Sequence, residues 1–219
     1  MVDRKRSFLS AIRSKFRHGL VLKYLGDRLE AKGVTIQPYY LCQEGPVGDK
    51  AVSRLPELDH DHELVHLGPE DMDELGKIED RSVTAEQMRR RLEQGQTCLA
   101  LKIDGQVAAF TWANLKQCPY PQGWEFDLAE DEAYLFDAYT SKAYRGRNLA
   151  ASLRYYQYEE LARAGRRRYY SVTLASNQPS LRFKKKVGAR LIRLSLYVKL
   201  FNRWRGHWTL KNYARTGME

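Results

Sequence analysis

Residues 134–150 read Tyr-Leu-Phe-Asp-Ala-Tyr-Thr-Ser-Lys-Ala-Tyr-Arg-Gly-Arg-Asn-Leu-Ala. The apolar and aromatic residues up to Tyr139 predict a strand, and the apolar spacing that begins at Leu149 predicts a helix. The loop between them, residues 145–148, places successive free backbone N–H groups at the positive end of a helix dipole. Gly146 lets the backbone approach a ligand closely. The stretch therefore predicts a cradle for a pyrophosphate, while the alternative is a glycine that serves the strand-to-helix turn alone.

Turn and cap signals divide the rest of the chain from residue 61 onward. They predict a strand at 64–67, helices at 69–78 and 84–92, strands at 98–103 and 107–115 around an Asp104-Gly105 turn, the strand, loop and helix above, a strand at 169–174, a helix from Asn177 to Gly188, and strands at 191–201 and 208–213 around Arg205-Gly206. This order predicts a mixed α/β domain over residues 61–219.

A second motif follows the predicted cradle by about thirty residues: Asn177-Gln-Pro-Ser180-Leu-Arg-Phe183-Lys184-Lys-Lys-Val-Gly188. The two motifs together resemble the strand 4, pyrophosphate loop and following helices of GNAT-type N-acetyltransferases. The strand portion is most similar to the Tyr-Leu-Glu-Asp-Leu-Tyr-Val pattern of the polyamine acetyltransferase branch. The resemblance covers about residues 62–213 and leaves the first 60 residues unexplained.

The resemblance implies the GNAT acyl-CoA N-acyltransferase fold, a mixed α/β sheet, and an acetyl-CoA donor without a metal. It places the pyrophosphate of the donor on Arg145, Gly146, Arg147, Asn148, Leu149 and Ala150. It places the acetyl group and pantetheine along the backbone of Ala138, Tyr139 and Thr140, with Asn177, Ser180 and Phe183 as further contacts. The expected reaction is direct transfer to a primary amine in a ternary complex.

Several positions depart from the family pattern. Asn148 replaces the second loop glycine, and asparagine tolerates the left-handed conformation that such a loop needs. Lys184 replaces the tyrosine that often protonates the departing thiolate, so it is expected either to act as that acid or to pair with a CoA phosphate. Phe136 replaces the acidic residue beside Asp137.

Asp137 and Glu132 are the candidates for taking the proton of the acceptor amine. Glu132 lies at the register where histone-type members place a base, and Asp137 matches an acidic position of the polyamine branch. Because neighbours on a strand alternate faces, the two carboxylates point in different directions unless a bulge intervenes. A solvated strand end and a buried structural carboxylate are the alternatives for Glu132 and Asp137.

The 219 residues carry 37 Lys and Arg against 27 Asp and Glu, a net charge of +10. Both termini are basic, with eleven Lys and Arg against Glu219 alone in residues 182–219. Such faces suit an anionic membrane surface or a nucleic acid, or simply the acidic stretch at 43–86. Three scattered cysteines indicate reduced thiols, and no apolar run or signal-peptide pattern is found, which predicts a cytoplasmic protein.

Residues 1–60 are expected to form an N-terminal extension with a basic amphipathic helix, a short strand at 34–42 broken by Pro38, and a linker. The helix stripe from Phe8 to Leu20 either packs on the main domain or lies on a membrane surface. His60, His62 and His66 lack a second cluster, so no metal site is expected. A homodimer is left open.

Three functional alternatives remain. The first is an acyl-CoA-dependent N-acetyltransferase. The second keeps the fold but uses a longer acyl or an aminoacyl donor. The third is a catalytically altered module that binds an anionic surface, either lipid or nucleic acid.

Overall fold

A computed structural model describes residues 29, 33–45, 62–120, 124–201 and 203–213. Its elements are β1 (Val34–Glu44), β2 (His62–His66), η2 (Pro69–Asp71), α3 (Met72–Gly76), α4 (Ala85–Glu93), β3 (Thr97–Ile103), β4 (Gln106–Asn114), β5 (Gln117–Tyr120), β6 (Trp124–Asp127), β7 (Glu132–Thr140), η3 (Lys142–Tyr144), α5 (Leu149–Arg163), β8 (Arg168–Leu174), α6 (Gln178–Lys186), β9 (Arg190–Leu200) and β10 (Trp204–Asn212). The predicted mixed α/β class is confirmed.

Two compact units make up the chain. The first comprises Met1–Leu41, Thr173–Leu181 and Leu191–Glu219, and the second comprises Cys42–Val172 and Arg182–Arg190. Strands β1 and β8 each run from one unit into the other, so both units share parts of them.

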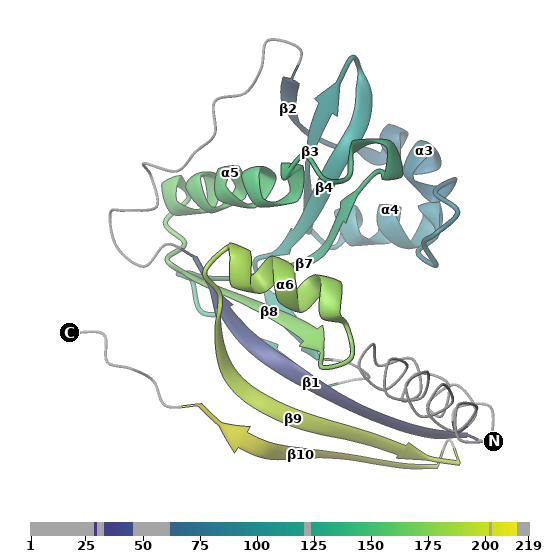
Figure 1. Cartoon of the computed structure of the whole chain (residues 1–219), viewed down its shortest axis with the longest axis vertical. Helices are drawn as coiled ribbons and strands as arrows, with labels where there is room; N and C mark the ends of the chain where they lie inside the picture. Colours follow the sequence, from purple (N-terminus) through teal and green to yellow (C-terminus); the bar gives the residue numbers. More distant parts are fainter. Residues whose placement is uncertain (1–28, 30–32, 46–61, 121–123, 202, 214–219) are drawn as a thin grey trace, which may run out of the picture. The chain divides into compact units, whose positions relative to one another are not determined.

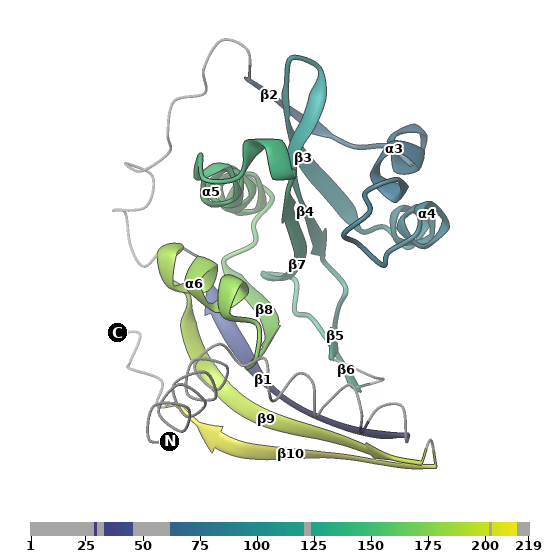
Figure 2. The ribbon, with the colours of Figure 1, turned by 45° about the vertical axis from the view of Figure 1, so that its right-hand side comes forward.

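The sheet of the second unit holds β2, β3, β4, β7 and the start of β8 as successive neighbours. All its pairs are antiparallel except β7 with β8, which is parallel. Helices α3 and α4 cover one face and α5 covers the other (Figures 1 and 2).

Alternation along β3 explains this two-sided cover. Cys98 and Ala100 pack with Met72 and Met88 of α3 and α4. Leu99 and Leu101, the residues between and beyond them, pack with the α5 side chains instead. A strand that is buried on both faces reads as a continuous apolar run, as this one does.

The α4 helix shows why the local predictions succeed. Thr84 accepts a hydrogen bond from the Gln87 backbone N–H at 3.2 Å, and the Gln87 side chain accepts one from the Thr84 N–H at 2.9 Å. This reciprocal pair is a capping box, which fixes where a helix begins. The predicted start at Thr84 is therefore confirmed.

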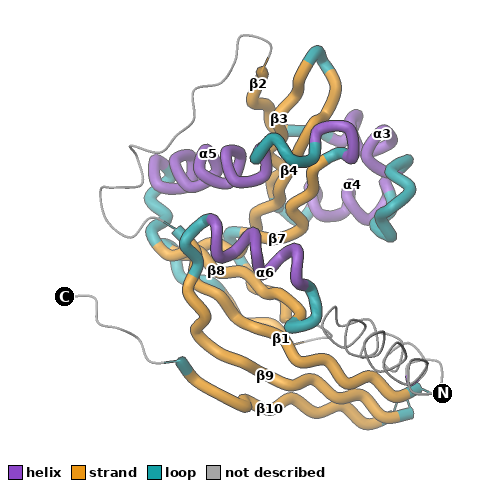
Figure 3. The backbone as a smooth tube through the Cα atoms, in the orientation of Figure 1, coloured by secondary structure: helices purple, strands orange, loops and turns teal. Residues whose placement is uncertain are grey.

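The first unit contains β10, β9, the first part of β1 and the end of β8 as neighbours. The predicted turn at Arg205-Gly206 is wrong, because both residues lie inside β10 and Gly206 pairs with Val198 of β9. Figure 3 shows β9 and β10 running side by side. The chain reverses earlier, where Phe201 has a φ of 50°. A Cβ atom on Gly206 would lie 2.2 Å from the Trp208 indole, so glycine is needed here for close packing and not for a turn.

Two further differences concern prolines. Strand β1 continues through Pro38, whose carbonyl accepts a hydrogen bond from the Ala175 N–H at 2.9 Å, so the predicted break is wrong. The β5–β6 hairpin was not predicted, because Pro119 lies within a strand of only four residues. The expected helix at 1–26 and His60 lie outside the described residues, and the division near residue 60 stays a prediction.

Candidate functional site

A β-bulge interrupts β7 at the centre of the candidate site. Phe110 of β4 pairs with Tyr139, and Trp112 pairs with Phe136, so Asp137 and Ala138 together oppose one residue. Asp137 has a φ of 47°, in the left-handed region. A bulge leaves its extra residue outside the ladder, which frees backbone groups beside Ala138. From the sequence, the relative direction of the Glu132 and Asp137 side chains depends on a bulge, and the structure contains one.

The bulge places the Asp137 carboxylate between two guanidinium groups. Arg81 Nη2 and Arg91 Nη1 each lie 2.6 Å from Asp137 Oδ2. Arg81 comes from the loop between α3 and α4, and Arg91 comes from α4. Charge-assisted hydrogen bonds of this length are strong and directional. The Asp137 carboxylate is thus fixed in place by the elements that cover this face of the sheet.

Sequence reasoning missed both arginines. Arg91 ends a run of three arginines, and nothing in the sequence separates it from its neighbours Arg89 and Arg90. The available signal was spacing, because Arg91 lies three residues after the buried Met88 and so shares its side of the helix. Arg81 lies in a loop, where spacing gives no such signal.

The predicted cradle lies where β7 leads through η3 into α5. Gly146 has a φ of 86°, and a Cβ atom placed there would meet nothing within 4 Å. Asn148 caps α5 in the left-handed conformation, with a φ of 65°. Among the described residues, no turn, loop or cap hydrogen bond uses the backbone N–H groups of residues 146–150. The loop thus has open space and donors facing the start of a fifteen-residue helix.

Asp80 links the α3–α4 loop to this cradle. Its carboxylate accepts hydrogen bonds from the Tyr139 hydroxyl at 2.8 Å and from Arg145 Nη2 at 2.9 Å. These two hydrogen bonds lower the pKa of Asp80. Burial and the neighbouring Asp80 raise the pKa of the Tyr139 phenol. Arg145, predicted for the pyrophosphate, is therefore already oriented by a carboxylate of this chain.

The parallel ladder between β7 and β8 is short. It joins Glu132, Ala133 and Tyr134 to Arg168, Tyr169 and Tyr170. Strand β7 continues to Thr140 beyond the last of these pairs. The backbone of Ala138, Tyr139 and Thr140 therefore lies past the end of this ladder, where the sequence predicts the pantetheine.

Glu132 lies at the opposite end of β7 from the cradle. Its carboxylate accepts hydrogen bonds from the Ala129 N–H at 3.0 Å and from the Tyr170 hydroxyl at 3.1 Å, and Arg168 Nη2 lies 3.3 Å away. Asp137 lies five positions further along the strand, so about 16 Å separates the Cα atoms of the two residues. The structure does not bring the two candidate carboxylates together.

Lys184 belongs to a buried polar cluster. Its ammonium contacts Glu44 Oε1, and the Tyr158 hydroxyl donates to Glu44 Oε2 at 2.7 Å. Arg154 Nε lies 3.5 Å from the same oxygen. Burial raises the pKa of Glu44, but Lys184 and Arg154 outweigh burial and bring it to about 2. Burial also lowers the pKa of Lys184, and Glu44 opposes that effect.

The role expected for Lys184 stays a prediction, and the structure shows the surroundings of its ammonium. Its side chain is only 7% exposed and is paired with a carboxylate, whereas the sequence predicted a thiolate acid or a phosphate contact. Glu44 was missed because it lies in the N-terminal extension, far from either motif. The carboxylate that neutralises Lys184 comes from β1 and is not visible in the helix motif.

The other residues predicted to contact pantetheine make contacts within this chain. Asn177 Oδ1 accepts from the Ser180 N–H at 3.1 Å, as an N-cap does, and the Ser180 hydroxyl lies 2.9 Å from Thr173 Oγ1. Phe183 lies beneath the Arg154 guanidinium, 5.6 Å from the ring centroid. The predicted contacts of these residues with pantetheine stay predictions.

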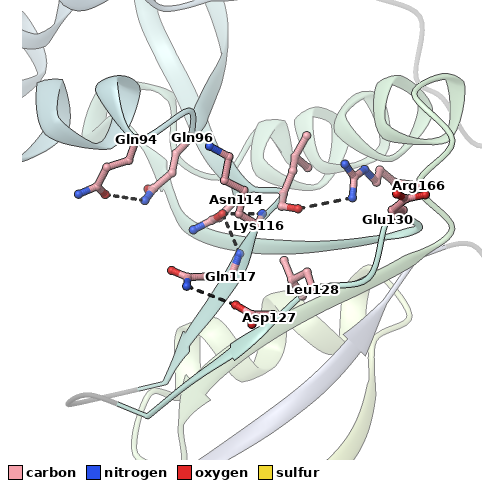
Figure 4. Close-up of a pocket in the computed structure, with 10 residues that line it drawn as sticks. Gln94, Gln96, Asn114, Lys116, Gln117, Asp127, Leu128, Glu130 and Arg166 are labelled. Atoms are coloured by element: carbon pink, nitrogen blue, oxygen red, sulfur yellow. Dashed lines mark hydrogen bonds between the residues drawn. The ribbon is translucent and has the colours of Figure 1, made fainter.

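A polar pocket of about 790 Å³ lies in the second unit. Figure 4 shows the side chains that line it. Gln94, Gln96, Asn114 and Arg166 are among its lining residues. Arg166 donates to the carbonyls of Leu115, Ala129 and Glu132, which ties the loop before β7 to the end of β4. The pocket contains none of the predicted site residues.

Other expectations concern metals, thiols and membranes. In the part of the chain that the structure describes, no cluster of metal-ligating side chains is found, and His66 contacts Glu160 at 3.1 Å. The three cysteines are free and buried, and burial raises the pKa of Cys42 to about 11. No described helix has the length and apolar character to span a bilayer.

The sequence is similar to a family of known proteins. The model of the acetyltransferase (GNAT) family matches residues 59–189, more than half of the chain. No protein of curated function matches the sequence.

Solved structures share the fold at low identity. A putative acetyltransferase of the GNAT family from Novosphingobium aromaticivorans has a TM-score of 0.51 and 22% identity, over 76% of this chain and 66% of that chain. A tandem GNAT protein from the clavulanic acid biosynthesis pathway has a TM-score of 0.57 and 15% identity, over 75% and 53%. A GNAT acetyltransferase from Colwellia psychrerythraea has a TM-score of 0.54 and 12% identity, over 78% and 59%. The chain thus spans between about half and two thirds of these relatives.

Proposed function

The chain belongs to the acetyltransferase (GNAT) family, and from this premise we propose that it transfers an acetyl group from acetyl-CoA directly to an amine. The observation that carries the proposal is the continuous run of bulge, loop and helix from Asp137 to Ala150. One end of that run offers freed backbone groups and a carboxylate, and the other offers open amides at a helix N-terminus.

The donor is held mainly by backbone groups. The N–H groups of residues 146–150 receive the pyrophosphate, with Arg145 and Arg147 supplying positive charge. The pantetheine extends along β7, beyond the last residue paired with β8. A backbone N–H beside Ala138 polarises the thioester carbonyl and stabilises the oxyanion that develops on it.

Proton transfer is assigned to Asp137 and not to Glu132. An alkylamine has an unperturbed pKa near 10, so a carboxylate or water must take its proton before attack. Asp137 adjoins the predicted oxyanion donor, whereas Glu132 lies about 16 Å further along the strand. A CoA thiol is acidic enough to leave as the thiolate, by analogy with cysteine, so Lys184 is not needed as the acid.

The test replaces Gly146 with valine and measures CoA affinity by calorimetry. A side chain at this position fills the space that the phosphates need, so Gly146→Val is expected to weaken CoA binding at least about tenfold, or about 1.4 kcal/mol. Unchanged affinity in the folded variant overturns the cradle.

Gly165→Val is the matched control. Gly165 has a φ of 81°, close to the 86° of Gly146, and likewise has nothing within 4 Å of its Cβ position. It lies after the C-terminal end of α5, so both variants carry the same backbone strain but only one alters the cradle. Release of free CoA with acetyl, longer acyl and aminoacyl donors then identifies the transferred group.

A further inference from the structure

The cluster of Arg81, Arg91 and Asp137 contains one more positive charge than negative charge. Arg81 is 6% exposed, while Arg91 and Asp137 are 23% and 21% exposed. One member is therefore almost fully buried, and the other two reach the surface. An excess cation at a partly open site favours a ligand that carries negative charge.

Aromatic rings hold both guanidinium groups in fixed positions. Arg81 lies over Phe110, 4.5 Å from the ring centroid, and Arg91 lies over Trp112 and Phe136 at 5.2 and 5.1 Å. Such contacts attract the cation to the ring face and replace water around it. The two arginines are thus preorganised, which reduces the entropic cost of binding an anion.

The cluster also leaves polar atoms unused. Both arginines contact Oδ2 of Asp137, and among the described residues no hydrogen bond to Oδ1 is found. Arg81 Nη1 is buried without a hydrogen-bond partner in the same part of the chain. A buried unsatisfied donor is costly, so a water or a ligand group is expected to accept a hydrogen bond from it. One acceptor atom of Asp137 and one donor atom of Arg81 therefore remain in the same ion-paired cluster.

We propose that the acceptor is a small molecule with an amine and an acidic group a few bonds apart, as in an amino acid. The ammonium binds Asp137 Oδ1, and the carboxylate binds Arg91 and the unsatisfied side of Arg81. The inference rests on the proposed function and names the acceptor class for that same site. It predicts that polyamines, which carry only positive charge, are poor acceptors.

The chemistry balances without a further reactant. The ammonium gives one proton to Asp137 Oδ1 and on to water, and the amine lone pair forms a bond to the thioester carbon. The nitrogen then loses its second proton to water as the carbon–sulfur bond breaks, and CoA leaves as the thiolate, which takes up a proton from water. Acetyl-CoA and the ammonium thus yield the amide, CoA and one proton.

The experiment compares three acceptor types at fixed acetyl-CoA: a panel of amino acids, the same amino acids as amides, and spermidine. The expected result is a kcat/KM at least about tenfold higher for the best amino acid than for its amide, because only the former fills the arginine site. Equal or better use of the amide or of spermidine overturns the inference and leaves the proposed function intact. Absence of turnover with every amine, together with absence of CoA binding, overturns the proposed function instead.

The arginine is tested with Arg91→Gln and the control Arg90→Gln. Arg90 precedes Arg91 on α4, but its side chain is 67% exposed and pairs with Glu86 one turn earlier. Arg91→Gln is expected to abolish the preference for the acid over its amide while CoA affinity stays unchanged, and Arg90→Gln is expected to retain the preference. Equal losses for the acid and the amide in Arg91→Gln overturn the assignment.

Discussion

Asp137 occupies a conformation that a strand residue rarely adopts. Its φ of 47° costs on the order of 1–3 kcal/mol unless the surroundings impose it. Two guanidinium groups at 2.6 Å supply that restraint. Asp137 belongs to the cluster with Arg81 and Arg91 and is also the neighbour of Ala138, the predicted oxyanion donor. Strained backbone at such a position is commonly part of a mechanism.

Replacing Asp137 by asparagine is expected to lower kcat by roughly 10²–10⁴-fold, because the amine loses its proton acceptor. CoA affinity, measured by calorimetry, is expected to stay unchanged because the cradle lies elsewhere on the chain. Glu132→Gln serves as the control, with turnover near that of the wild type. If the losses appear in Glu132→Gln instead, the proton acceptor is Glu132.

Strand β1 and helices α5 and α6 each contribute a charged side chain to the buried cluster around Glu44. Glu44 and Lys184 are 5% and 6% exposed, and Arg154 is 1% exposed. Removing Glu44 leaves the Lys184 and Arg154 cations without their counter-charge, whereas removing Lys184 leaves Glu44 paired with Arg154. The cluster therefore links β1, α5 and α6 through buried charges that depend on one another.

A double-mutant cycle tests this coupling. Glu44→Gln is expected to lower the free energy of unfolding by about 3–5 kcal/mol because it leaves two buried cations, and Lys184→Met by less because Arg154 still pairs with Glu44. The double variant is expected to lose less than the sum of the two. Urea denaturation at pH 7 measures all three. Additive losses contradict a coupled pair.

The pH dependence follows from the lowered pKa of Glu44. A carboxyl whose pKa falls to about 2 on folding stabilises the protein fully above its unfolded value, near 4.3. That stabilisation is lost as the pH falls from there toward 2. In the Glu44→Gln/Lys184→Met variant this part of the acid dependence is expected to disappear.

Local signals predicted most helices and strands, and contacts distant in sequence explain what they missed. Residues that are neighbours in sequence determine three of these features: the capping box at Thr84, the Asp104-Gly105 turn and the loop at Gly146. Neighbouring residues do not determine the partners of Asp137 and Lys184, because each pair is formed by residues 46 to 140 positions apart. Sequence therefore located the candidate carboxylate and lysine without their electrostatic surroundings.

Strand β1 contributes buried side chains to the core. Tyr39 and Cys42 of β1 are completely buried, and Glu44 completes the cluster with Lys184. Sequence divided the chain near residue 60 because the family motifs begin there. The buried side chains of β1 indicate that stability extends further toward the N-terminus than those motifs do.

A chain that begins at residue 61 is therefore expected to be much less stable than one that begins at residue 33. The first loses β1 and leaves Lys184 buried without its carboxylate, and the second keeps both. Thermal unfolding of the two purified proteins gives the comparison. Equal melting temperatures contradict a structural role for β1.

The position of β1 also has a consequence for synthesis on the ribosome. Tyr39 stacks on His207, 168 positions later, and Glu44 meets Lys184, 140 positions later. At about 5–20 residues per second, β1 emerges roughly ten to thirty seconds before the strand that carries His207. The Glu44 carboxylate has no native partner until Arg154, Tyr158 and Lys184 have emerged, and Tyr39 lacks the His207 ring until the end of that interval. Until β8 and β9, its neighbours in the sheet, are synthesised, the nascent chain exposes both edges of β1, and an exposed strand edge favours association with other chains.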